Sequence, residues 1–330
     1  MIEQHRNYEK EPKRINGVLV LVVLNLLIWG SAITLWMQAA EVPPEATLRT
    51  VATEIVNVSE PTTDSSFEIE DALSLSDVDF TIASNSALLL NLDTGEILFN
   101  HRAGNRVYPA SITKIMTVLI GLEYADGQDM YVQANFDELF AIGASLAGFA
   151  PGERRTLSEI LHGTLLASGA DATSTLAYSV AGSYVGFVDL MNNKARSLGM
   201  ENTNFMNASG LHHEDQYTTA YDIAILLDYA LTYPEFRSLF TTQTYDFISI
   251  AGFTQTLTST MFRLMDSRTF RGGRIIGGKT GFTTPAGLCL ASLATDGNDE
   301  FILLTFGAPS DQNRPLHIDD AMVIYEYFFN

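Results

Sequence analysis

The chain has few basic residues and almost no cysteine. Its 330 residues include 19 Lys and Arg against 39 Asp and Glu, which gives a formal net charge of -20 at pH 7. A surface with this excess of negative charge repels polyanions, so a nucleic-acid partner is disfavoured. The single cysteine, Cys289, excludes an intrachain disulfide and a cysteine-based metal cluster. Because its neighbours are glycine, leucine and alanine, we predict that Cys289 packs in a buried strand.

Charge is missing altogether from residues 18–37. A helix of about twenty apolar residues matches a hydrocarbon core about 30 Å thick. Four basic residues precede this segment, whereas the first one after it is Arg49, and this asymmetry places the N-terminus in the cytoplasm. We therefore predict a cytoplasmic segment at 1–17 and a single transmembrane anchor at 18–37, with the rest of the chain outside. A cleaved secretory signal is the alternative, although the apolar run is longer than a typical signal core.

Residues 38–81 have the composition of a linker. The stretch 41–79 carries ten acidic side chains and one basic side chain, together with three prolines and many Thr and Ser. Like charges and prolines favour an extended coil over a packed core. About forty coil residues have an r.m.s. span of roughly 35 Å. The predicted catalytic domain, 82–330, is thus expected to stand off the membrane.

The pattern of apolar residues in the domain predicts strands at both ends and helices between them. A strand, a tight turn at Gly95 and a second strand occupy 87–99, and a helix with buried apolar positions occupies 111–124. Further helices are expected at 158–166, 171–180, 187–198 and 220–231, further strands at 273–279, 287–294 and 300–306, and a last helix at 315–327. This order predicts an α/β protein of the α+β type. Its antiparallel sheet is assembled from both chain ends and flanked by helices, with a helical subdomain in the middle.

Ser111 and Lys114 are three residues apart on the predicted 111–124 helix. At that spacing the two side chains face each other, with about 5 to 6 Å between their Cβ atoms. A lysine kept neutral by burial and by the positive end of the helix dipole can take the serine proton. The plain alternative is a helix-capping serine beside a solvated lysine.

Lys279, Thr280 and Gly281 follow Gly277 and Gly278 on a predicted strand. Glycines let a substrate backbone approach closely, and a cation beside a hydroxyl on an exposed strand can hold a carboxylate. The next backbone N–H, that of Phe282, is a candidate to form an oxyanion hole with the N–H of Ser111. The alternative is a lysine on a strand edge that prevents aggregation.

Together these residues resemble a known family. Ser111-x-x-Lys114, then Ser168-Gly169, then Lys279-Thr280-Gly281 resemble the three motifs of penicillin-binding proteins and serine β-lactamases. The segments 108–110, 151–153, 210–212, 217–222 and 287–290 resemble the low-molecular-weight D-alanyl-D-alanine carboxypeptidases, and the likeness covers about 84–330. The resemblance implies the penicillin-recognising serine hydrolase fold, a place at the bacterial cell membrane, and peptidoglycan stem peptides and β-lactams as ligands.

The resemblance also implies an acyl-enzyme mechanism. In it Ser111 is the nucleophile, Lys114 its base, and Ser168 relays a proton to the leaving D-alanine, while Lys279 and Thr280 hold the terminal carboxylate. The family's second motif usually has Asn where this chain has Ala170. Losing one hydrogen bond to a polarised group costs roughly 1.5 to 3 kcal/mol, or about one to two decades in rate. We therefore expect weak activity rather than none.

No cofactor and no metal are expected. His212 and His213 are adjacent, but no third ligand lies at metal spacing, so neither is assigned a role. Three functional alternatives stay open: a β-lactamase, which would need a water-activating carboxylate that the sequence does not suggest; a transpeptidase, which shares the acyl-enzyme; and a catalytically silent wall-binding scaffold. The oligomeric state is not predicted.

Overall fold

The computed structural model describes Phe67 and residues 72–133, 143–310 and 314–329. The predicted cytoplasmic segment, the predicted anchor and most of the predicted linker lie outside the described residues. Within the described residues, no helix has the length and apolar character needed to cross a bilayer.

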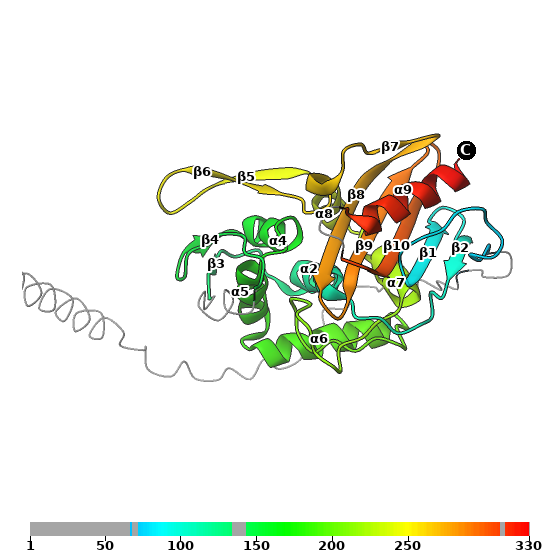
Figure 1. Cartoon of the computed structure of the whole chain (residues 1–330). Helices are drawn as coiled ribbons and strands as arrows, with labels where there is room; N and C mark the ends of the chain where they lie inside the picture. Colours follow the sequence, from blue (N-terminus) through cyan, green and yellow to red (C-terminus); the bar gives the residue numbers. More distant parts are fainter. Residues whose placement is uncertain (1–66, 68–71, 134–142, 311–313, 330) are drawn as a thin grey trace, which may run out of the picture. The chain divides into compact units, whose positions relative to one another are not determined.

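A six-stranded antiparallel sheet is the centre of the domain (Figure 1). Its spatial order is β2-β1-β10-β9-β8-β7, so the first hairpin pairs directly with the last strand. The strands are β1 (Ser86–Asn91), β2 (Ile97–His101), β7 (Thr269–Phe270), β8 (Gly273–Thr283), β9 (Gly287–Thr295) and β10 (Glu300–Ala308). The predicted antiparallel sheet built from both chain ends is confirmed, as is the hairpin turn at Gly95, whose φ is +75°.

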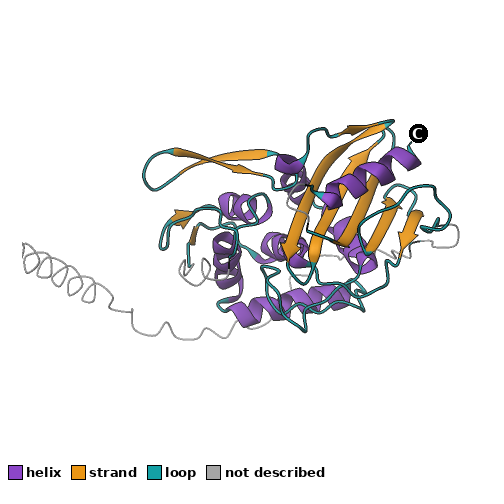
Figure 2. Ribbon diagram, in the orientation of Figure 1, coloured by secondary structure: helices purple, strands orange, loops and turns teal. Residues whose placement is uncertain are grey.

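The predicted helices are present, with ends that differ by up to three residues from those expected. They are α4 (Leu157–Leu165), α5 (Ala170–Ala181), α6 (Tyr184–Ser197), α7 (Ala220–Leu231) and α9 (Leu316–Phe328). A further helix, α8 (Pro234–Thr241), was not among the predicted ones. Local chemistry explains several starts: Thr156 and Glu159 form a reciprocal capping box at α4, and Thr219 caps α7 by accepting from the Asp222 N–H. Figure 2 shows helices on both faces of the sheet.

The helix predicted from Ser111 begins differently from the expectation. Ala110–Thr113 form a 3₁₀ turn, η1, and the α-helix, α2, runs over Lys114–Tyr124. Pro109 precedes the turn and fixes the entry of the chain. The prediction of one continuous α-helix was therefore wrong at its first turn, which is the part that carries the serine.

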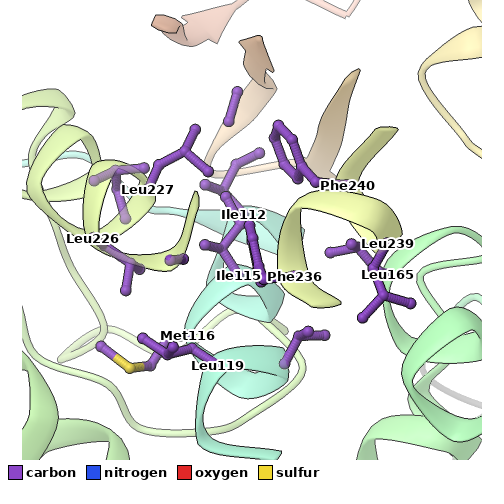
Figure 3. Close-up of a cluster of buried hydrophobic side chains, with 14 of the residues drawn as sticks. Ile112, Ile115, Met116, Leu119, Leu165, Leu226, Leu227, Phe236, Leu239 and Phe240 are labelled. Carbon is purple, nitrogen blue, oxygen red and sulfur yellow. The ribbon is translucent and has the colours of Figure 1, made fainter. Parts of the chain in front are cut away.

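Two apolar clusters fill the two faces of the sheet, because successive side chains of a strand point to opposite sides. On one face α2 packs against α4, α5, α7 and α8; in Figure 3, Ile115 of α2 lies beside Phe236 of α8. On the other face α9 packs against β9 and β10, and the rings of Phe270 and Tyr325 stack 4.8 Å apart. Cys289 is buried in β9, as predicted.

Two small two-stranded sheets were not predicted. One pairs β3 (Met130–Tyr131) with β4 (Arg154–Arg155), and the other is a hairpin of β5 (Thr244–Ile248) and β6 (Thr254–Thr258). A second 3₁₀ turn, η2 (Phe262–Leu264), follows that hairpin. The strands of the hairpin are largely exposed and polar, so they lack the apolar alternation that announces a strand. Residues 72–81, within the predicted linker, contact the sheet: Leu73 N donates to Leu98 O at 3.1 Å.

Candidate active site

Ser111 lies where the η1 turn meets strand β8. The residue before it, Ala110, has a φ of +45°, which is unusual for a residue with a side chain. Gly281 of β8 packs directly against this turn, since a Cβ atom at that position would lie 2.8 Å from the Ser111 nitrogen. A glycine therefore lets the strand come close to the backbone N–H of the serine.

Lys114, the first residue of α2, reaches back to the serine. Its Nζ lies 3.2 Å from Ser111 Oγ and also donates to the carbonyl oxygen of Ser209. The side chain is buried, and this desolvation lowers the pKa of Lys114 to about 7, although the negative charge of Asp171 acts in the opposite direction. Near neutral pH a large fraction of this amine is uncharged, which is the state that can accept the serine proton.

The segment around Ser209 was missed by the sequence analysis as part of the site. Its carbonyl holds Lys114 across 95 positions of sequence. The next residue, Gly210, has a φ of +81°, and a Cβ atom there would lie 1.9 Å from Ala110 O. Only glycine fits that contact. The Gly-Leu-His sequence was noted as a family likeness, but nothing in it signals that the preceding carbonyl binds a lysine.

Ser168 lies between α4 and α5 in a left-handed conformation, with a φ of +58°. Its Oγ is buried and has no hydrogen-bond partner among the described residues. Strained backbone and unsatisfied buried polar atoms both cluster at functional sites. The following helix α5 begins at Ala170, which is buried and lines the same cavity as Ser168.

Lys279 and Thr280 are more buried than predicted. Their side chains are 1% and 8% exposed, so the expectation of an exposed strand, or of a lysine on a strand edge, was wrong for this part of β8. Lys279 Nζ donates to Thr280 O at 2.7 Å, and Thr280 Oγ1 donates to Thr260 Oγ1 at 2.7 Å. Burial and the nearby positive charge of Lys114 lower the pKa of Lys279 well below its usual value.

A cavity of about 60 Å³ joins the predicted site residues. It is lined by Ser111, Lys114, Gly143, Ala144, Ser145, Ser168, Ala170, Ser209, Gly210, Leu211, Phe282 and Thr283. Four of the seven predicted site residues are therefore together, while Lys279, Thr280 and Gly281 lie in the adjacent strand rather than in the described lining. No lining residue carries a carboxylate.

The two adjacent histidines lie outside this lining. The ring of His212 packs edge-on against Tyr108 at 4.7 Å, and His213 Nδ1 lies 3.9 Å from an Asp215 oxygen. Neither contact brings an imidazole to the Ser111 hydroxyl. Within the part of the chain that the structure describes, the hydrogen-bond partner of the Ser111 hydroxyl is Lys114 and not an imidazole.

Comparison with known proteins gives a consistent result. The family model described as D-alanyl-D-alanine carboxypeptidase matches residues 72–310. The D-alanyl-D-alanine carboxypeptidase DacF of Bacillus subtilis is 35% identical over 237 residues, which is 70% of this chain and 59% of that protein. The carboxypeptidase DacC of Escherichia coli is 31% identical over 248 residues, covering 71% and 59%. The chain thus spans about 59% of the length of these curated relatives.

Solved structures support the predicted penicillin-recognising fold. The DD-transpeptidase of a Streptomyces strain is 27% identical with a TM-score of 0.67, over 76% of this chain and 99% of that one. A penicillin-binding protein homologue from Mycobacterium tuberculosis is 25% identical with a TM-score of 0.66, over 76% and 92%. The α+β fold with its antiparallel sheet and helices is shared with these proteins.

Proposed function

Because this chain belongs to the D-alanyl-D-alanine carboxypeptidase family, we propose that it removes the terminal D-alanine from peptidoglycan stem peptides through an acyl-enzyme on Ser111. One observation carries the proposal: a buried lysine, whose pKa is lowered to about 7, lies with its Nζ 3.2 Å from the serine Oγ. This is the arrangement of an activated nucleophile, in which a neutral base stands within reach of a hydroxyl.

The reaction follows from this geometry. Neutral Lys114 takes the proton of Ser111 as Oγ attacks the carbonyl carbon of the penultimate D-alanine. The N–H groups of Ser111 and Phe282 stabilise the oxyanion, which the close approach of Gly281 to the serine nitrogen supports. The peptide bond then breaks, and the leaving amine of D-alanine receives the proton from Lys114 through Ser168. Water hydrolyses the ester and restores the Ser111 hydroxyl.

The terminal carboxylate of the substrate is assigned to Lys279 and Thr280. Thr280 Oγ1 exchanges its bond to Thr260 for one to the carboxylate. The negative charge of the bound substrate favours the protonated form of Lys279, which burial otherwise disfavours. β-Lactams carry a carboxylate in the corresponding place and are expected to acylate the same serine.

The chain is further proposed to be a single-pass protein of the bacterial cell membrane. Support comes from the uncharged segment at 18–37 and from the basic residues before it. The catalytic domain then faces outward, where peptidoglycan is found. Cell fractionation with external protease tests this, because an outward domain is degraded in intact spheroplasts whereas a cytoplasmic domain is protected.

The activity is tested by incubating the full chain with diacetyl-Lys-D-Ala-D-Ala and measuring free D-alanine beside the Ser111→Ala variant. Release that disappears in the variant is expected. A fluorescent penicillin provides a second readout, because a protein that is neither labelled nor active would be a wall-binding scaffold.

Transpeptidation is the second candidate. Two observations favour it: the likeness to a DD-transpeptidase structure, and a cavity lining without a carboxylate to activate water. Adding a D-amino acid acceptor and analysing the products separates the two reactions. The same lack of a carboxylate predicts slow turnover of nitrocefin, and rapid steady-state hydrolysis would instead indicate a β-lactamase.

A further inference from the structure

The segment 145–149 begins at the lining of the cavity and forms neither a helix nor a strand. Its first residue, Ser145, lines the cavity beside Ser111. We call 145–149 the wall segment. Since this segment has no ladder or helix of its own, its backbone N–H groups must find partners elsewhere.

Three of those N–H groups converge on one carboxylate. The nitrogens of Ala147, Gly148 and Phe149 donate to Asp171 at 2.8, 2.9 and 3.1 Å, and both carboxylate oxygens are used. Asp171 is fully buried in the first turn of α5, and the N–H of Ala172 also donates to it at 2.9 Å. Hydrogen bonds to a charged acceptor are about twice as strong as neutral ones, and a buried carboxylate needs them.

The wall segment is also tied to the start of α5 through its own carbonyl. Ser145 O accepts from the Ala170 N–H at 2.8 Å. The second motif of the site, Ser168 to Ala170, is thus bordered on one side by the wall segment and followed immediately by Asp171. At this position the chain has no amide side chain that reaches toward Lys114, because residue 170 is alanine.

We propose that Asp171 is a positioning residue of the site: it holds the wall segment against α5, and its negative charge acts on Lys114. This inference rests on the proposed function, since the reaction is the one assigned to Ser111. Asp171 touches no reacting atom and acts through the wall segment and the lysine.

Gly169 supports the same arrangement. Its φ of -67° and ψ of 121° suit any residue, so backbone conformation does not require glycine there. A Cβ atom, however, would lie 2.6 Å from Asp171 Oδ1 and 2.7 Å from the Ala147 nitrogen. Glycine is needed at position 169 because the wall segment and the Asp171 carboxylate are both packed against it.

The first test is Asp171→Asn in the full-length protein in detergent. An amide has one accepting oxygen and an NH₂ group that opposes a donor, so the wall N–H groups that face the new NH₂ group lose their acceptor and those that remain lose the charge of theirs. We expect at least one of the amide hydrogens of Ala147, Gly148 and Phe149 to exchange at least about tenfold faster, and acylation by a fluorescent penicillin to slow by about tenfold or more. Unchanged exchange at these amides overturns the proposal.

The pH profile separates a positioning role from a structural one. Acylation requires neutral Lys114, and its charged neighbours are Asp171 on α5, which raises the pKa of Lys114, and Lys279 on β8. Asp171→Asn removes only the first, so the pKa of Lys114 falls and the acid limb of the pH profile of acylation moves to lower pH. If Asp171→Asn is slower but the acid limb of its pH profile stays at the wild-type pH, Asp171 has only a structural role, which contradicts the proposal.

Gly169→Ala is the matched variant. This variant keeps the carboxylate charge but pushes the wall segment away. We therefore expect slower acylation, with the acid limb of its pH profile at the same pH as in the wild type. If Gly169→Ala is acylated at the wild-type rate, packing of the wall segment against Gly169 is not needed for acylation and the proposal is wrong. This test remains valid even if Asp171→Asn fails to fold. If the wild-type protein neither releases D-alanine nor reacts with penicillin, the proposed function fails, while amide exchange still decides whether Asp171 holds the wall segment.

Discussion

The two faces of the central sheet are built differently. On the face covered by α9, buried rings stack and the Tyr325 hydroxyl pairs with Ser292 Oγ at 3.0 Å. On the face covered by α2, the interior near Ser111 contains two lysines, a carboxylate and a serine hydroxyl that has no partner among the described residues. Buried charges and strained backbone cost stability, whereas stacked rings contribute to it. The α9 face therefore contributes stability without cost to a site, whereas the buried charges and strained backbone near Ser111 lower the stability of the α2 face.

The sharpest way to break this comparison is Ser111→Ala. We expect D-alanine release to fall by about a thousandfold or more, because the bond-forming atom is removed. The midpoint of thermal unfolding should stay the same, since the change removes one hydroxyl from the site. Release of D-alanine close to the wild-type rate would mean that a residue other than Ser111 is the nucleophile.

Tyr325→Ala tests the opposite face. Removing this buried ring should lower the free energy of unfolding by about 3 to 5 kcal/mol. Well below the unfolding transition, kcat/KM should remain at the wild-type value. Denaturant unfolding measures the first quantity and D-alanine release the second. Val323→Ala is the control: that side chain lies on the same helix, is 38% exposed, and should change stability by less than about 0.5 kcal/mol.

The pH dependence of acylation tests the burial of Lys114. The neutral form is the active base and the pKa of Lys114 is lowered to about 7, so the rate should rise with pH through that value. Between pH 6 and pH 8 the rise should be about tenfold. Stopped-flow labelling with a fluorescent penicillin measures it. A rate that stays flat from pH 6 to pH 8 would mean that Lys114 is not the base.

Ala170→Asn probes the departure from the usual second motif. Restoring the amide should increase acylation by about tenfold, because one hydrogen bond to a polarised group is regained. The comparison is made with the wild-type protein under the same substrate and pH. An active enzyme that does not respond would show that another group already fills the role, and the Ser209 carbonyl on Lys114 is the candidate.

Tyr325→Phe is the mildest change. It keeps the ring stack and removes only the hydroxyl bonded to Ser292, so unfolding should become easier by about 1 kcal/mol. Activity should not change. A loss as large as that of Tyr325→Ala would mean that the hydrogen bond, and not the ring, stabilises the α9 face.

Much of the fold followed from local patterns. Apolar periodicity placed α4 to α7 and the long strands, and Gly95 marked the first turn, because these features depend on neighbours in sequence. The β5–β6 hairpin was not predicted, because its strands are largely polar and exposed. The 3₁₀ turn at Ser111 was not predicted either, since its geometry depends on contact with Gly281 of a distant strand.

Residue types and their spacing are enough to identify the chemical groups of the site: Ser111 three residues before Lys114, Ser168, and the Lys279 motif, together with alanine where an amide is usual. The state of these groups depends on how the chain is packed in three dimensions. This packing buries Lys279, brings the Ser209 carbonyl to Lys114 and directs three wall N–H groups to Asp171. Desolvation and long-range hydrogen bonds arise from residues far apart in the sequence, whereas the type of each side chain and the spacing between motif residues can be read from neighbouring positions.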